Sequence, residues 1–285
     1  MDDLKIKQML DRFLFFYDKA SLENADPERR FELWKEHYGF TFVPPGYEKD
    51  QFEREMLNYA WDKYSLVYDR IKYFEIDEVN LQELVTPVKQ ALQYDEPISL
   101  TLLFFVGTFE TEPFILEQDH EYTLCFPIET EWNEFKLLQE IVRVVHCCKS
   151  GLAPSQTRTL AQLIFQEGIA LHTARQLMSK QANIKTELLW SREKCSREPN
   201  RIMINIIPHL SRTDYEALFS FTKGTGASGY EKEANFTGWI VVKHLLDNGR
   251  TVGDLASVPK EDVDTFVERS LFSLLNHAYI IQPQE

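Results

Sequence analysis

The sequence predicts an α+β protein that is predominantly helical, with a small, mostly antiparallel sheet near the middle of the chain. Helical spacing of apolar residues dominates both ends of the chain, whereas residues 98–128 are rich in β-branched and aromatic side chains. With 285 residues, 44% of them hydrophobic, the chain can bury a large core without a metal or disulfide. We expect a single domain, residues 1–285, with a helical N-terminal region (1–95), a central region (96–180) and a helical C-terminal region (181–285).

The N-terminal region is expected to form helices separated by a loop. Asp26 is a good N-cap and Pro27 suits a first helical position, so one helix should begin there. Pro44, Pro45 and Gly46 in succession predict a loop. The helices expected in this region cover residues 4–19, 27–34, 47–74 and 80–92.

Strands are expected at residues 98–106, 112–116 and 122–128, and the last two are separated by a short polar turn. Short connections favour antiparallel neighbours, which is why a mostly antiparallel sheet is predicted. His120 and Glu121, in that turn, begin like the zinc-binding motif HExxH. Leu124 stands where the second histidine is required, so we expect no metal site there.

Long helices should follow the sheet. Thr130 is a candidate N-cap for a helix over residues 131–149, and Ser155 for one that reaches about residue 180. Further helices are expected at residues 213–222 and 231–247, and two more divided near Pro259. The glycine-rich loop at residues 224–229 matches neither a phosphate-binding nor a dinucleotide-binding loop, because no buried strand precedes it.

The charge balance limits the partners that we expect. Forty-five acidic and 31 basic residues give a net charge of −14, which repels nucleic acid and anionic lipid. The sequence has no signal-peptide pattern at its N-terminus and no apolar run long enough to span a membrane. We therefore expect a cytoplasmic protein that binds neither nucleic acid nor membranes. The sequence does not determine its oligomeric state.

The four cysteines, Cys125, Cys147, Cys148 and Cys195, show no CxxC spacing, and we expect reduced thiols. Consecutive side chains on a helix point about 100° apart. His146 and the two cysteines that follow it therefore cannot all converge on one ion if that segment is helical.

The most informative segment is Gln139-Glu140-Ile141-Val142-Arg143, which has the layout of HExxH without its histidines. In that motif two imidazoles on one helix face hold zinc, and the glutamate acts as a base on the metal-bound water. Glutamine is a poor zinc ligand, and a guanidinium has no lone pair to offer. No metal is therefore assigned to this segment.

Several segments, taken in order, resemble the bacterial predicted zinc-dependent proteases. They are residues 40–46, the strand ending in Cys125-Phe126-Pro127-Ile128-Glu129, the helix with Glu140 and His146, the Glu167-Gly168-Ile169-Ala170 element and the late Gly238-Trp239 pair. That family is gluzincin-like, with an HExxH helix and a third ligand from a Glu-Gly-x-Ala element on the next helix. The resemblance implies a zincin-like core in which the sheet lies beside the HExxH-type helix.

Carried over by position, the resemblance makes Gln139 and Arg143 vestigial histidine positions, Glu140 the general base and Glu167 the carboxylate ligand. His146 matches a further family histidine and is expected in the same cleft one turn along. Only the two glutamates keep their functional identity. We therefore expect an inactive metallopeptidase homologue without a cofactor, whose cleft is vestigial or binds a peptide, a partner protein or a small ligand.

Three alternatives remain open at this stage. One is an active zinc-dependent hydrolase with a displaced site formed by His146, Glu167 and Glu140. Another is thiol chemistry at Cys147 or Cys148, for which the sequence supplies neither a positioned base nor an oxyanion hole. The third is a globular protein whose likeness to proteases is accidental or carries no information about function.

Glu167 lies among apolar residues of its helix and needs a partner if it is buried. Arg143 can hold a carboxylate through two hydrogen bonds, so we expect an ion pair between them. His172 lies about 140° around the helix from Glu167 and is expected to be structural.

Overall fold

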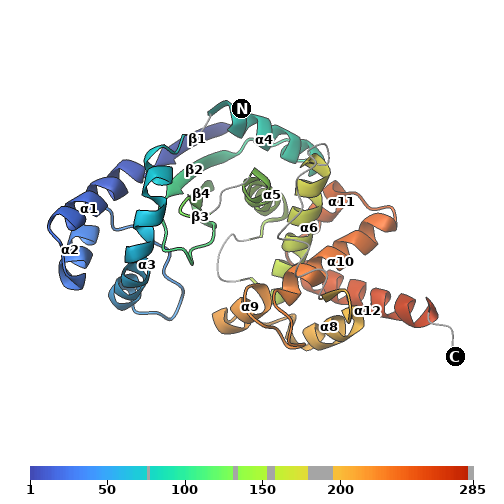
Figure 1. Cartoon of the computed structure of the whole chain (residues 1–285). Coiled ribbons are helices and arrows are strands. Elements are labelled where there is room, and N and C mark those ends of the chain that lie inside the picture. The colour runs from blue at the N-terminus through green and yellow to red at the C-terminus, as the bar shows by residue number, and fades with distance from the viewer. Residues whose placement is uncertain (76–77, 131–133, 153–157, 179–194, 282–285) are drawn as a thin grey trace. The chain divides into compact units, whose positions relative to one another are not determined.

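A computed structural model describes residues 1–75, 78–130, 134–152, 158–178 and 195–281 (Figure 1). The fold is α+β and mainly helical, as predicted. The chain divides into two compact units, Met1–Glu83 with Pro97–Glu134, and Leu84–Glu96 with Phe135–Glu285. The division falls within helix α4 (Glu78–Ala91). The expectation of one zincin-like domain stays a prediction.

The first unit contains a four-stranded sheet with the order β1-β2-β4-β3. Its strands are β1 (Asp3–Gln8), β2 (Ser99–Phe105), β3 (Phe114–Gln118) and β4 (Glu121–Pro127). β2 pairs in parallel with both β1 and β4, and only β3 and β4 pair antiparallel. The prediction of a mostly antiparallel sheet is therefore wrong. β4 forms a hairpin with β3 on one side, but its neighbour on the other side is β2, which runs parallel to it.

The β3–β4 hairpin confirms the predicted polar turn. Asp119 and His120 both have positive φ, 52° and 64°, the combination that a tight two-residue hairpin turn requires. His120 therefore lies at the tip of a hairpin and not on a helix.

The expected helix over residues 4–19 is wrong at its start. Leu4 and Ile6 alternate with Asp3, Lys5 and Lys7, a period of two, and this segment forms the edge strand β1. Helix α1 (Leu10–Leu22) begins after it. Long-range pairing stabilises this strand, because β1 pairs with β2, which lies more than 90 residues away in the sequence.

Two further helices belong to the first unit, α2 (Pro27–His37) and α3 (Lys49–Lys72). Asp26 caps α2 as predicted, accepting a hydrogen bond of 2.9 Å from the Arg29 backbone N–H. Tyr64 of α3 is buried, and its hydroxyl donates to the Gly107 carbonyl oxygen at 2.8 Å, just beyond β2. This contact ties α3 to the loop that leaves the sheet.

The second unit is helical. Its main elements are α5 (Glu134–Ser150), α6 (Leu160–Met178), α8 (Pro199–Ile206), α9 (Tyr215–Thr222), α10 (Glu233–Asp247), α11 (Val252–Ala256) and α12 (Val263–Ile281), with a short 3-10 turn at Ile207–His209. Ser155, the predicted N-cap, lies outside the described residues. None of the helices in the described ranges is long and apolar enough to cross a membrane.

The glycine-rich loop wraps around a buried carboxylate. Glu233 is fully buried, and its Oε1 accepts hydrogen bonds from the backbone N–H groups of Ser228 and Tyr230 at 2.8 and 3.1 Å. A Cβ atom on Gly226 would lie 2.5 Å from the Glu233 carboxyl carbon. The loop therefore binds a carboxylate of its own chain, and Gly226 leaves the space that this side chain occupies.

Helices α6 and α10 pack backbone to backbone (Figure 1). A Cβ atom on Gly168 would lie 2.2 Å from the Gly238 carbonyl oxygen, and one on Gly238 would lie 2.2 Å from the Ile164 carbonyl oxygen. Backbone atoms cannot give way as a flexible side chain can. This contact therefore requires glycine on both helices.

Gly168→Ala and Gly238→Ala should each lower the free energy of unfolding by about 1–3 kcal/mol, because the added methyl forces the helices apart. Urea denaturation measures the change. Gly253→Ala is the matched control, since its methyl would meet the Gln93 side chain, which can rotate. Equal losses in all three variants would contradict the close approach of α6 and α10.

Candidate functional site: a polar cluster at the predicted metal position

The structure places the Arg143 side chain of α5 against the Glu167 carboxylate of α6. Arg143 Nε donates to Glu167 Oε1 at 2.9 Å, and Nη2 donates to Oε2 at 2.7 Å. This bidentate pairing confirms the predicted ion pair. It joins the helix that carries the HExxH-type segment to the helix that carries the Glu-Gly-x-Ala element.

Two further side chains complete the cluster. Arg143 Nη1 donates to Glu140, three residues earlier on α5, and Asn235 Nδ2 of α10 donates to Glu167 Oε2 at 2.9 Å. The side chains of Arg143, Glu140 and Glu167 are only 17%, 12% and 13% exposed. One guanidinium therefore holds two poorly hydrated carboxylates, and three helices meet at the cluster.

Electrostatics keeps Arg143 charged. Burial by itself lowers the pKa of a guanidinium, but the adjacent carboxylates of Glu140 and Glu167 outweigh burial and raise the pKa of Arg143 above its ordinary value. A group with so high a pKa neither loses its proton nor offers a lone pair near neutral pH. Arg143 therefore acts as a fixed cation.

A second guanidinium, that of Arg158, lies close to the same cluster. Burial lowers the pKa of Arg158, while the negative charges of Glu167 and Glu140 act in the opposite direction. Arg158 donates to the Gln166 amide oxygen, and Gln166 Nε2 in turn donates to the Arg143 carbonyl oxygen at 3.3 Å. Gln166 thus links Arg158 to the backbone of α5.

Sequence reasoning missed Arg158, Gln166 and Asn235. A signal existed for Asn235, which lies three residues before Gly238 and therefore on the face of α10 that contacts α6. Gln166 is a polar residue in an otherwise apolar stretch directly before Glu167. Arg158 precedes α6, and no local pattern indicates where its long side chain extends.

His146 lies in the protein interior and is not bonded to the two carboxylates. It is 0% exposed, and within the described residues neither ring nitrogen has a hydrogen-bond partner. Its ring centroid is 6.2 Å from that of Phe165. Burial, with smaller contributions from the charges of Arg158 and Lys149, lowers the pKa of His146 to about 3. Gln139, on the same helix, is also buried.

These residues do not fit a zinc ion. Both oxygens of Glu167 accept hydrogen bonds from a guanidinium whose positive charge would repel a dication. Within the described ranges, no three His, Cys, Asp or Glu side chains lie close enough together to hold a metal ion. The displaced site of His146, Glu167 and Glu140 is therefore not assembled in the described structure.

The remaining candidates have structural contacts. His172 Nε2 lies 2.9 Å from the Trp239 carbonyl oxygen, and the two rings stack with centroids 3.8 Å apart, as expected for a structural histidine. None of the four cysteines, all of which lie in the described ranges, forms a disulfide bond. Cys147 is buried, and its sulfur accepts a hydrogen bond from Gln166 Nε2 at 3.3 Å.

No family model matches the chain, and no curated protein sequence matches it significantly. The resemblance to zinc-dependent proteases therefore rests on the sequence motifs alone.

Arg143→Ala should lower the free energy of unfolding by about 3–5 kcal/mol, because it leaves two poorly hydrated carboxylates without their counter-charge. Adding Glu167→Gln should recover part of the loss. Arg201→Ala is the matched control, since Arg201 also pairs with a glutamate three residues away, but their side chains are 58% and 44% exposed. A loss as small as that of the control would show that the cluster does not stabilise the fold.

His146 should make the protein less stable in mild acid. The unfolded chain takes up a proton on this histidine near pH 6.5, whereas the folded chain resists protonation down to about pH 3. Its contribution is therefore fully present above pH 6.5 and decreases as the pH falls, by up to about 2 kcal/mol at pH 5.

Urea denaturation at pH 7.5 and pH 5 measures this loss. His146→Leu should reduce it, while His120→Asn, at a hairpin tip where the side chain is 96% exposed, should not. Equal pH dependence in all three proteins would contradict the assignment.

Proposed function

We propose that the protein is an inactive relative of gluzincin-type zinc peptidases, in which an arginine has replaced the metal ion. The observation that carries the proposal is the bidentate contact between Arg143 and Glu167. These residues stand at the second histidine position and the third ligand position of the family motif. Their direct contact is what a retained gluzincin frame requires, because zinc ligands must converge on one point.

Arginine supplies the positive charge of a zinc ion but not its catalytic chemistry. A guanidinium can neutralise Glu140 and Glu167, yet it has no vacant coordination position and cannot lower the pKa of a bound water as zinc does. Glu140, the residue at the general-base position, itself accepts a hydrogen bond from Arg143. The cluster therefore lacks both the electrophile and an available base of a zinc hydrolase.

The cluster instead acts as a structural link. Arg143 joins α5 to α6, and Asn235 extends the hydrogen-bonded network to α10. In this proposal the ancestral metal position is vestigial and stabilises the helices of the second unit. A peptide or protein ligand for a retained cleft stays a prediction from the resemblance.

The purified protein should contain well under one zinc ion per chain. We also expect no chelator-sensitive cleavage of casein and no change of melting temperature with chelator, because the described residues contain no ligand set for the ion. Elemental analysis of protein prepared without a histidine tag, together with a casein assay with added zinc, tests this. Stoichiometric zinc with chelator-sensitive proteolysis would overturn the proposal.

Restoring the two histidines should restore metal binding. The double variant Gln139→His, Arg143→His removes the guanidinium and directs two imidazoles towards Glu167, so it should bind about one zinc per chain. Gln139→His with Arg143→Ala is the matched control, because it also lacks the guanidinium but supplies a single new ligand. Circular dichroism checks that each variant folds, and a folded double variant with no more zinc than the control would refute the gluzincin frame.

A further inference from the structure

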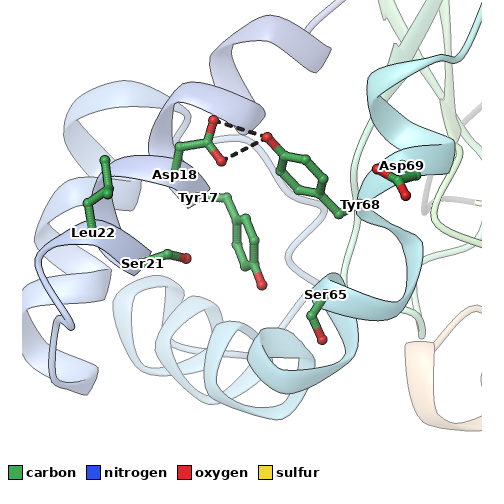
Figure 2. Close-up of a pocket in the computed structure, with 7 residues that line it drawn as sticks. All are labelled: Tyr17, Asp18, Ser21, Leu22, Ser65, Tyr68 and Asp69. Carbon is green, nitrogen blue, oxygen red and sulfur yellow. Dashed lines mark hydrogen bonds between the residues drawn. The ribbon is translucent and has the colours of Figure 1, made fainter.

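The first unit contains a second site candidate, a pocket between α1 and α3 that is open to solvent. Its volume is about 650 Å³, within the usual range for sites that bind small molecules. Figure 2 shows Tyr17 and Asp18 from α1 beside Tyr68 from α3, with Leu22 and Asp69 at opposite edges of the pocket, and two serines complete the lining. This pocket belongs to neither the polar cluster nor any motif recognised in the sequence.

Aromatic rings form one part of the pocket. The Tyr17 and Tyr68 rings are half-buried, with their centroids 5.8 Å apart and their planes inclined by 39°. Tyr17 also lies 5.0 Å from the Trp61 ring, over which the Arg30 guanidinium is placed at 4.4 Å. The neighbouring aromatic surface therefore already binds a cation of this chain, the interaction that an electron-rich ring face favours.

Carboxylates form the other part. The Tyr68 hydroxyl lies 2.9 and 3.1 Å from the two Asp18 oxygens and, as the donor, holds this carboxylate at the pocket (Figure 2). Asp69 contributes a second exposed carboxylate, and no lining residue is basic. Lys72, which does not line the pocket, places its Nζ 6.0 Å from the Tyr68 ring centroid. The lining thus combines acidic and aromatic groups without a basic group of its own.

Leu22 adds an apolar wall. It lines the pocket and is 89% exposed, so an aliphatic chain laid against it would be removed from water. The pocket therefore offers three kinds of contact to one ligand: negative charge, aromatic faces and an aliphatic surface. A ligand that satisfies all three has a cationic head and a short apolar arm.

We propose that this pocket binds an organic cation, an ammonium or guanidinium group on an aliphatic arm. The head lies beside Asp18 against the tyrosine rings, Asp69 adds negative charge at the edge of the pocket, and the arm lies along Leu22. A free amine and a lysine or arginine side chain of a polypeptide share this chemistry. The proposal is independent of the inactive-peptidase proposal, because every residue involved belongs to the first unit.

The test is an NMR titration of the ¹⁵N-labelled full-length protein with butylguanidinium, with butylurea as the uncharged control of nearly equal shape. Butylguanidinium should shift the amide signals of Tyr17, Asp18 and Asp69, and butylurea should bind at least about threefold more weakly. A second titration uses a capped Ala-Lys-Ala peptide. Tighter binding of the peptide identifies a polypeptide side chain as the source, and tighter binding of butylguanidinium identifies a free cation.

Variants separate specific binding from general attraction to a negatively charged protein. Asp18→Asn, Asp69→Asn and Tyr17→Leu should each weaken butylguanidinium binding by about two- to fivefold. Asp11→Asn removes the same charge from an exposed position of α1 outside the pocket and should leave binding unchanged. Equal binding of butylurea, shifts confined to other residues, or equal weakening by Asp11→Asn would each overturn the proposal.

Discussion

The second unit depends on the need to neutralise the Glu167 carboxylate inside a helical core. A carboxylate removed from water among Ile164, Ile169 and Ala170 costs several kcal/mol unless it is paired and hydrogen-bonded. Arg143 supplies the charge and two hydrogen bonds, and Asn235 supplies a third. The compensation thus comes from side chains of the neighbouring helices α5 and α10.

The close contact between α6 and α10 makes this solution sterically accessible. Asn235 is a short side chain, and it reaches Glu167 because the two backbones meet at Gly168 and Gly238. Gly168 follows Glu167 directly, and Gly238 follows Asn235 by one helical turn. The glycine of the Glu-Gly-x-Ala element thus has a packing role in this chain that does not require a metal.

Other buried carboxylates of the protein accept hydrogen bonds from backbone N–H groups instead of a guanidinium. In the first unit, Glu129 accepts hydrogen bonds from the Gly107 and Phe109 backbone N–H groups at 2.7 and 3.1 Å, and burial still raises its pKa. In the second unit the glycine-rich loop surrounds Glu233 in a similar way. Backbone N–H groups bind a buried carboxylate beside a loop, because loop N–H groups are available as donors. Between helices a guanidinium binds the carboxylate, because the N–H groups in the interior of a helix are already hydrogen-bonded.

Local signals in the sequence determined the helix that starts at Asp26, the polar hairpin turn before β4 and the pairing of Arg143 with Glu167. Caps, tight turns and the cost of an unpaired buried charge act over a few residues or a single pair, so a pattern can reveal them. Leu4 and Ile6 alternate with polar residues as in a strand, but tertiary structure decided that they form one, since β1 is stabilised by a partner far away in the chain. It likewise decided that Asn235 reaches Glu167 and that His146 is enclosed without a partner. The spacing of residues in a sequence fixes the direction of a side chain around its own helix, but not which residues of other helices lie opposite it.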